Sequence, residues 1–306
     1  MNELTALLEG LRAFAMRFKG EHGYVLSKGA TGVLRWRSEP HDLLHHPSDN
    51  PPELYDERRL RPTGHKPNSA NDGYRTQIGF MDHYVKFPFG RDPEEGRAEA
   101  ARELGAYTVL GSLGFRVPHT SVVKDGRGGI GVVSRRIGEG GMDAFHTFDK
   151  ASPVDYDQWE SQDSTLPHPA DRIYQPLSEA LVLDHDRHTG NMMVDQHHRR
   201  WDLDFGTSEA DRWLTGLTAD DTGMIAGRAQ ALMGHIAGRA QPDAQAAALS
   251  SLKKIVDPDA EDHFDWLRSA DKAPYRAVGV ADHHRQVISS LRLLRPDLQR
   301  VLDQHS

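Results

Sequence analysis

The spacing of apolar positions changes along the chain and divides it into segments. Residues 3–19 carry leucine and phenylalanine at helical spacing, which predicts an amphipathic opening helix. Three pairs of short alternating runs, within 24–36, 74–87 and 117–137, flank turn residues, so each pair predicts a β-hairpin. Residues 38–69 contain six prolines, and we expect a long irregular connection there.

Helical spacing dominates the rest of the chain. One strongly helical stretch, residues 94–113, begins after Pro93 and ends at Gly114. A glycine-rich segment at 138–141 looks like a hinge, and beyond it helical spacing recurs at 177–184, 219–237, 244–255, 260–267 and 283–303. A β-rich half, a hinge and an α-rich half predict an α+β fold of two lobes with a cleft between them.

The composition is ordinary for a globular protein and excludes several kinds of function. Lys and Arg number 37 against 45 Asp and Glu, a net charge of −8, and a mildly acidic chain without a basic block is a poor nucleic-acid binder. The absence of cysteine excludes disulfides and thiolate metal sites. Because no apolar run could span a bilayer and the N-terminus carries no signal-peptide core, we expect a cytoplasmic protein without integral membrane association.

Acidic and amide side chains gather in one polar segment. Residues 181–194 read Leu-Val-Leu-Asp-His-Asp-Arg-His-Thr-Gly-Asn-Met-Met-Val, and residues 201–206 read Trp-Asp-Leu-Asp-Phe-Gly. Two short strands joined by a polar turn would bring Asn191 and Asp204 close to Asp186. Magnesium prefers such oxygen ligands, and phosphoryl transfer needs a carboxylate aimed at the attacking hydroxyl.

The pattern Asp-Arg-His-x-x-Asn followed by Asp-Phe-Gly resembles the protein-kinase-like superfamily. It is most similar to the phosphatidylinositol 3-/4-kinases and the bacterial HipA-type Ser/Thr kinases, with family-like separations of five positions from Asp186 to Asn191 and thirteen from Asn191 to Asp204. The resemblance implies that Asp186 is the catalytic base, that Asn191 and Asp204 are metal ligands and that His188 is a structural histidine. The alternative is a surface hairpin rich in Asp and His.

A lysine upstream extends the resemblance. Lys86 lies in the apolar run Tyr-Val-Lys-Phe-Pro, where a charge is costly unless it is paired or holds a ligand. It resembles the kinase strand lysine that contacts the α- and β-phosphates of ATP. The helix that follows implies Glu103 as its partner, with Glu99 on the same face as the fallback. The alternative is a surface lysine with solvated helix glutamates.

The loop expected to cover the ATP phosphates departs from the kinase pattern. No Gly-x-Gly-x-x-Gly precedes Lys86, and the best substitute is the segment 63–73. By resemblance, Gly64, Ser69 and Asn71 would bind the nucleotide there, although a plain turn is equally open. The second glycine-rich segment, 126–131, lies inside a hairpin, so we expect a β-turn.

The resemblance covers roughly residues 62–210 and implies a two-lobed kinase-like fold. It would comprise an N-terminal extension (1–60), a small β-rich N-lobe with one main helix (61–140) and a helical C-lobe (141–306). The implied activity is ATP- and Mg²⁺-dependent transfer of the γ-phosphoryl group to a hydroxyl, with Ser/Thr of a protein as the first expectation. A lipid or small-molecule kinase, an AMP transferase and a pseudokinase binding module are the alternatives. ATP and a protein substrate are the expected partners, in the cytoplasm or, for an effector, in a host cell.

Overall fold

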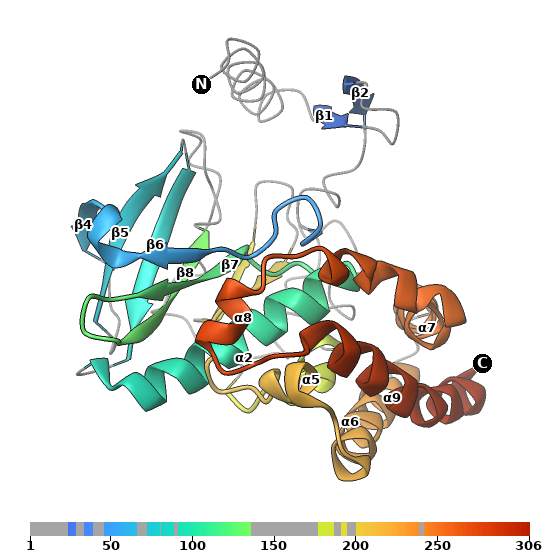
Figure 1. The fold of residues 1–306 in the computed structure, drawn as a ribbon. Coiled ribbons are helices and arrows are strands. Elements are labelled where there is room, and N and C mark those ends of the chain that lie inside the picture. Colours follow the sequence, from blue (N-terminus) through green and yellow to red (C-terminus); the bar gives the residue numbers. More distant parts are fainter. Residues whose placement is uncertain are drawn as a thin grey trace.

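The computed structural model confirms the predicted α+β class (Figure 1). A six-stranded sheet with one long helix packed on it lies beside a group of helices. The structure describes residues 24–28, 34–38, 46–65, 72–79, 81–88, 91–135, 177–186, 191–194, 200–238 and 242–306. The predicted opening helix and the glycine-rich hinge at 138–141 lie outside these residues.

The large sheet is mixed. Its strands are β3 (Leu54–Asp56), β4 (Pro62–His65), β5 (Asp72–Ile78), β6 (Met81–Phe87), β7 (Thr120–Lys124) and β8 (Ile130–Arg135), in the spatial order β3-β7-β8-β6-β5-β4. Neighbouring strands are antiparallel except for β3 and β7, which are parallel. The strand that carries Lys86, β6, therefore lies inside the sheet, with neighbours on both sides.

All three predicted hairpins are confirmed. Strands β1 (Tyr24–Lys28) and β2 (Leu34–Ser38) pair with each other, and β5 pairs with β6 through a turn in which Gly79 adopts a positive φ of 62°. Strands β7 and β8 are joined by residues 125–129 of the glycine-rich region, where Asp125 Oδ1 accepts hydrogen bonds from the backbone N–H groups of Arg127 and Gly129. This segment is a β-turn, as expected.

The prediction of an irregular connection over residues 38–69 was wrong. This stretch contains β3, a short 3-10 helix η2 (Glu57–Arg59) and β4. Pro62 opens β4, which is an edge strand, and proline is tolerated at such positions because no ladder hydrogen bond is lost there. β3 is held by a distant partner, β7, rather than by any local pattern.

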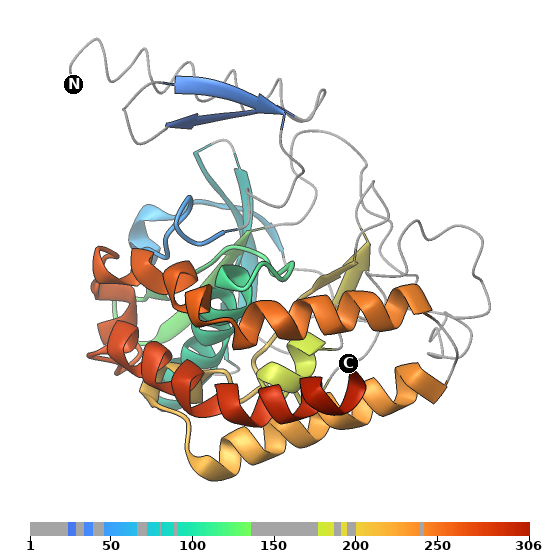
Figure 2. The ribbon, with the colours of Figure 1, turned by 90° about the vertical axis from the view of Figure 1, so that its right-hand side faces the viewer.

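The predicted helices are present with small changes in their ends. They are α2 (Pro93–Ser112), α6 (Ala219–Gly238), α7 (Pro242–Val256), the 3-10 helix η5 (Pro258–Arg268) and α9 (His283–His305). Two short helices, α5 (Asp211–Thr215) and α8 (Ala273–Ala277), were not predicted. The helix expected at 177–184 ends at residue 181, because Leu183 adopts a positive φ of 51°. Figure 2 shows α6, α7 and α9 packed side by side. Among the described helices, none is long and apolar enough to cross a bilayer.

Helix α2 joins the sheet to the helical region. It begins with Asp92 capping the N–H groups of Glu94 and Glu95, and it contacts β7 and β8 on one side and α5 and α8 on the other. Two glycines mark the closest approaches. A Cβ atom at Gly96 would overlap the carbonyl oxygen of Ile130, and one at Gly105 would overlap that of Ala210. The position of α2 is therefore fixed from both sides.

We expect Gly105→Ala to destabilise the protein by about 1–3 kcal/mol, because the added methyl group must push α2 away from the segment at Ala210. Urea unfolding measures the loss. The matched control is Gly234→Ala in α6, where a Cβ atom would meet nothing within 4 Å, and there we expect a gain of up to about 1 kcal/mol from helix propensity. Equal effects of the two changes would contradict the close approach at Gly105.

Candidate functional site

The side chain of Lys86 is the centre of a buried ionic cluster. Its Nζ atom lies 2.5 Å from Glu99 Oε1, 2.7 Å from Asp204 Oδ1 and 3.4 Å from Glu103 Oε1. The lysine side chain is only 8% exposed, so its charge needs partners of this kind. Three carboxylates from two further parts of the chain meet one ammonium group.

Local structure explains how these groups meet. Val85 and Phe87 point to one face of the sheet and pack with Val123 and Val133, so Lys86 points to the other face, where α2 lies. Glu99 and Glu103 are four residues apart in α2 and therefore share one side of the helix. Both the predicted partner Glu103 and the fallback Glu99 contact Lys86, and Glu99 is the closer.

Asp204 reaches the cluster from the opposite side. It follows the hairpin of β9 (Met192–Val194) and β10 (Arg200–Asp202), the two short strands predicted from the sequence. Its backbone is left-handed, with φ of 55°, a conformation that costs a non-glycine residue about 1–3 kcal/mol. The side chain is 44% exposed, in contrast to Glu103 at 5%. Asp204 is thus the member of the cluster most open to solvent.

Burial and neighbouring charges shift the pKa values in this cluster. Burial alone lowers the pKa of Lys86, but the carboxylates of Glu103, Asp204 and Glu99 raise it above its ordinary value. Burial raises the pKa of Glu103 to about 7 against the pull of Lys86, and the neighbouring Asp204 and Glu99 add to that rise. Burial, first, and the charges of Asp204 and Glu99, second, therefore favour the protonated form of Glu103.

The same carboxylates fit a divalent cation. One oxygen atom from each of Glu99, Glu103 and Asp204 lies within 4.8 Å of the others. Carboxylate oxygens are the ligands that magnesium prefers. Asp204, the most exposed of the three, is also the residue that the sequence predicts as a metal ligand.

Hydrogen bonds connect Asp186 and Asn191 to Leu203, the residue before Asp204. Asn191 Nδ2 donates a 3.0 Å hydrogen bond to the carbonyl oxygen of Asp186, and the carbonyl oxygen of Asn191 accepts one of 2.8 Å from the N–H of Leu203. Asp186 is exposed. The structure thus links the loop of Asp186 to the residue preceding Asp204. His188 lies outside the described residues.

Several supporting residues carry no signal in the sequence. Asp202 is fully buried and accepts a hydrogen bond from Ser178 Oγ at 3.0 Å, while its own N–H donates to the carbonyl of Arg116. Arg102 of α2 donates a 2.8 Å hydrogen bond to the carbonyl oxygen of Gly206. These contacts join residues far apart in the chain, so no local spacing could have predicted them.

The predicted nucleotide-binding loop is only partly described. Gly64 lies in strand β4, paired with Arg75 of β5, and not in a loop as expected. The edge strand β4 extends the hairpin further than the prolines suggested, and this brings Gly64 into the ladder. Ser69 and Asn71 lie outside the described residues. The roles of all three residues in nucleotide binding stay predictions.

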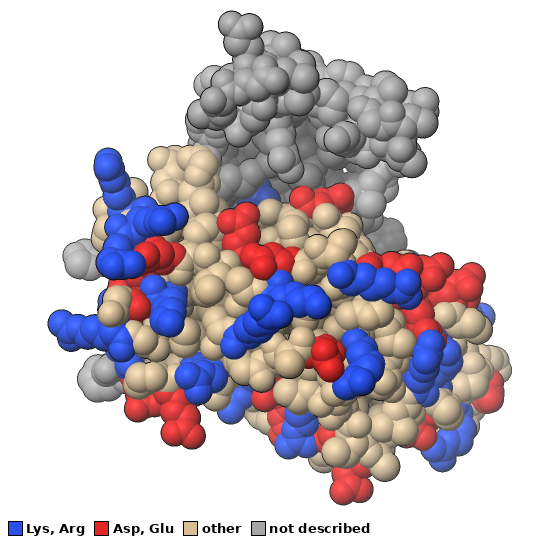
Figure 3. Space-filling model, in the orientation of Figure 1, with Lys and Arg blue, Asp and Glu red and all other residues tan. Residues whose placement is uncertain are grey.

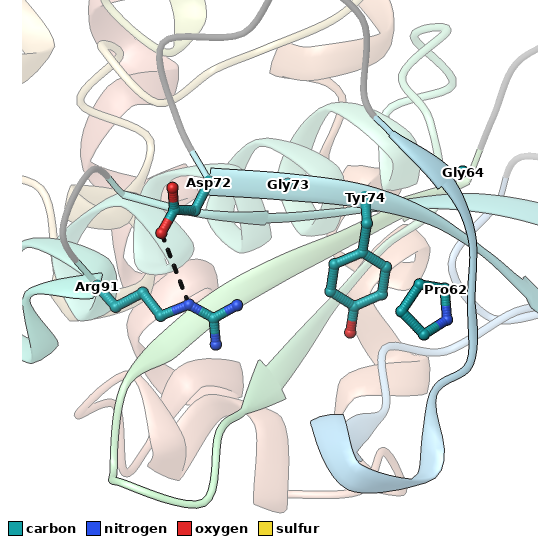
Figure 4. Close-up of a pocket in the computed structure, with 6 residues that line it drawn as sticks. All are labelled: Pro62, Gly64, Asp72, Gly73, Tyr74 and Arg91. Carbon is teal, nitrogen blue, oxygen red and sulfur yellow. Dashed lines mark ion pairs between the residues drawn. The ribbon is translucent and has the colours of Figure 1, made fainter.

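A cavity of about 470 Å³ lies beside strands β4 and β5 (Figure 4). It is on the opposite face of the sheet from Lys86, as the strand pairing shows. It is lined by Pro62, Gly64, Asp72, Gly73, Tyr74 and Arg91. Tyr74 and Asp72 pair with Val85 and Phe87, whose side chains point away from α2. The Arg91 guanidinium lies 2.9 Å from Glu57 Oε2 and 3.7 Å from Asp72 Oδ2, and stacks over the ring of Phe87. Its charge is thus already matched by carboxylates.

The surface in Figure 3 mixes both charge signs. Lys and Arg side chains are interspersed with Asp and Glu over the described surface on this face. The expectation that the protein does not bind nucleic acid stays a prediction.

Fold and site together describe an α+β protein with a small sheet-and-helix part beside a helical part, consistent with the two-lobed kinase-like fold expected from the sequence. Among solved structures, the chain is similar to the crystal structure of the Helicobacter pylori proinflammatory kinase CtkA. The TM-score is 0.46 and the sequence identity 11%, over 83% of this chain and 98% of that chain. No protein-family model matches the chain, and no curated protein matches it.

Removal of the Lys86 ammonium should reveal the repulsion among its carboxylate partners. We expect Lys86→Met to destabilise the protein by about 3–5 kcal/mol, because it removes the ammonium that the carboxylates of Glu99, Glu103 and Asp204 share. Addition of Glu99→Gln to this variant should restore part of the loss, because it removes the carboxylate that lies closest to the missing ammonium. Chemical denaturation of the single and double variants gives both values.

Lys253→Met is the control for this pair, since Lys253 lies exposed in α7 and its loss should change the stability by no more than about 0.5 kcal/mol. A double variant less stable than Lys86→Met alone would show that Glu99 does not add to the repulsion among these carboxylates.

Proposed function

We propose that this protein is an ATP- and Mg²⁺-dependent phosphotransferase that moves the γ-phosphoryl group of ATP to a hydroxyl. The observation that carries the proposal is the contact of Lys86 with Asp204, 118 positions apart in the chain, together with Glu99 and Glu103. The sequence assigned these residues to two separate kinase-like motifs. Their meeting at one buried point is what a phosphate and metal site on this scaffold requires.

Lys86 is proposed to bind the α- and β-phosphates of ATP. Its ammonium is held by Glu99 and Glu103, so its position is set by α2 and its charge is retained in a buried place. Asp204 and Asn191 would hold the magnesium ion, which when bound supplies positive charge to the phosphate oxygens. The solvent exposure of Asp204 supports this assignment, since a fully buried carboxylate could not bind a metal ion from solution.

Asp186 is proposed to be the catalytic base. Its exposed position leaves room for an acceptor hydroxyl, whose proton the carboxylate would take as the oxygen attacks the γ-phosphorus. The hydrogen bond from Asn191 to the carbonyl oxygen of Asp186 supports a fixed position of these two residues relative to each other. A Ser or Thr side chain of a protein is the proposed acceptor, because a side chain on a surface segment can approach an exposed carboxylate.

Incubation of the protein and candidate acceptor proteins with magnesium and either γ- or α-labelled ATP tests this function. Transfer of the γ label to serine or threonine is the expected result. Transfer of the α label would identify an AMP transferase instead. Labelled lipid or small molecules without labelled protein would overturn the protein acceptor, and nucleotide binding without any transfer would indicate a binding module.

Substitution of Asp186 and substitution of Asp204 should impair the reaction in different ways. We expect Asp186→Asn to lower kcat at least about 100-fold and to leave the affinity for magnesium and ATP within about twofold, because the carboxylate acts on the acceptor hydroxyl. Asp204→Asn should instead weaken magnesium-dependent nucleotide binding about tenfold or more, because it removes a metal ligand. Calorimetry with a non-hydrolysable ATP analogue separates binding from turnover.

Asp220→Asn is the control, since Asp220 is an exposed residue in the first turn of α6 and should alter neither quantity. Turnover near the wild-type level in Asp186→Asn would show that this residue is not the base.

A further inference from the structure

His185, the residue before Asp186, is held between two charged side chains. Arg228 Nη2 lies 3.1 Å from its Nδ1 atom, and Glu209 Oε1 lies 3.2 Å from its Nε2 atom. Arg228 also donates a 2.7 Å hydrogen bond from Nη1 to the carbonyl oxygen of Asp184. One guanidinium from α6 thus contacts both the backbone and the side chain immediately before the proposed base.

The hydrogen-bond partners of His185 determine which nitrogen of its imidazole ring carries the proton. A guanidinium only donates hydrogen bonds, so Nδ1 of His185 must accept from Arg228 and carries no proton. The proton of the neutral ring is therefore on Nε2, which donates to the carboxylate of Glu209. In this arrangement Arg228 donates to His185, and His185 donates to Glu209.

Glu209 is itself fixed in place. Its backbone N–H donates a 2.8 Å hydrogen bond to the carbonyl of Val182, and its Oε2 atom lies 2.7 Å from Arg212 Nη2. Arg212 in turn pairs with Asp221 of α6. Because Glu209 follows Asp204 by only five residues, this row of side chains ties the segment after Asp204 to the segment before Asp186.

The backbone beside Asp186 needs such support. Leu183 adopts a positive φ of 51°, which costs a branched residue about 1–3 kcal/mol, and this conformation turns the chain out of the helix at 177–181 toward Asp186. The hydrogen bond from Arg228 to the carbonyl of Asp184 lies one residue beyond this point.

We propose that Arg228, His185 and Glu209 are positioning residues, which set the Asp186 carboxylate relative to Asp204. This inference rests on the proposed phosphotransferase function. His185 is about half exposed and Glu209 about a quarter exposed, so their interactions contribute little to folding stability. Their role is to fix the loop geometry, and their loss should therefore affect turnover more than folding.

The test compares turnover, nucleotide binding and loop exchange in the same variants. We expect Arg228→Met to lower kcat about tenfold or more, to leave KM for ATP within about twofold, and to speed hydrogen exchange of the amides at 182–186. Glu209→Leu should behave similarly, whereas Glu209→Gln, which keeps an acceptor for Nε2–H, should lose less. The double variant Arg228→Met, Glu209→Leu should lose little more than Arg228→Met alone, because both act through His185.

Arg300→Met is the matched control, since Arg300 forms an ion pair with Asp297 on the exposed side of α9 and should change neither kcat nor loop exchange. An active wild type with unchanged kcat in Arg228→Met would overturn the positioning role alone. Unchanged hydrogen exchange at 182–186 in that variant would overturn it as well. A wild type without any transferase activity would overturn the proposed function itself.

Discussion

The buried ammonium group of Lys86 is the constraint on which the arrangement of this protein depends. A lysine in the middle of a sheet must lose its hydration, and only carboxylates brought from elsewhere can replace it. Those carboxylates come from α2 and from the segment after β10, so strand, helix and hairpin must all be in place before the charge is satisfied. A buried ion pair is weak evidence for stability, because an apolar residue of similar volume often serves the fold equally well. The cluster is therefore better explained by what it can bind than by what it stabilises.

The carboxylates gathered around Lys86 support the proposed magnesium site. Three acids facing one ammonium raise the pKa of Glu103 to about 7, through burial first and through the repulsion of Asp204 and Glu99 second. Asp204, the most exposed member, is the point at which an additional positive charge would relieve that repulsion. The repulsion among these carboxylates and the exposure of Asp204 both support the proposed binding of a cation on the solvent side of Lys86.

Local features of the structure could be predicted from the sequence, and long-range ones could not. The alternating runs identified all three hairpins, and Pro93 marked the start of α2, because strand alternation and helix start signals are encoded in neighbouring residues. Helical spacing placed Glu99 and Glu103 on one face but could not tell which lies nearer to Lys86. The parallel pairing of β3 with β7 and the contact of Arg228 with His185 join segments tens of residues apart. Only packing decides such contacts, and the prolines around β3 gave a misleading local signal.

Helix α2 couples the two sides of the candidate site. Its Glu99 and Glu103 side chains contact Lys86. From the same helix, Arg102 donates a hydrogen bond to the carbonyl oxygen of Gly206, two residues after Asp204. Its glycines leave no space for a shift, since Gly96 lies against the backbone of Ile130 and Gly105 against that of Ala210. A displacement of α2 would therefore move the partners of Lys86 and the anchor of the Asp204 segment together. The geometry of lysine and aspartate is set jointly by this one helix, and the separate contacts from Arg228 and Glu209 are left to set the position of Asp186.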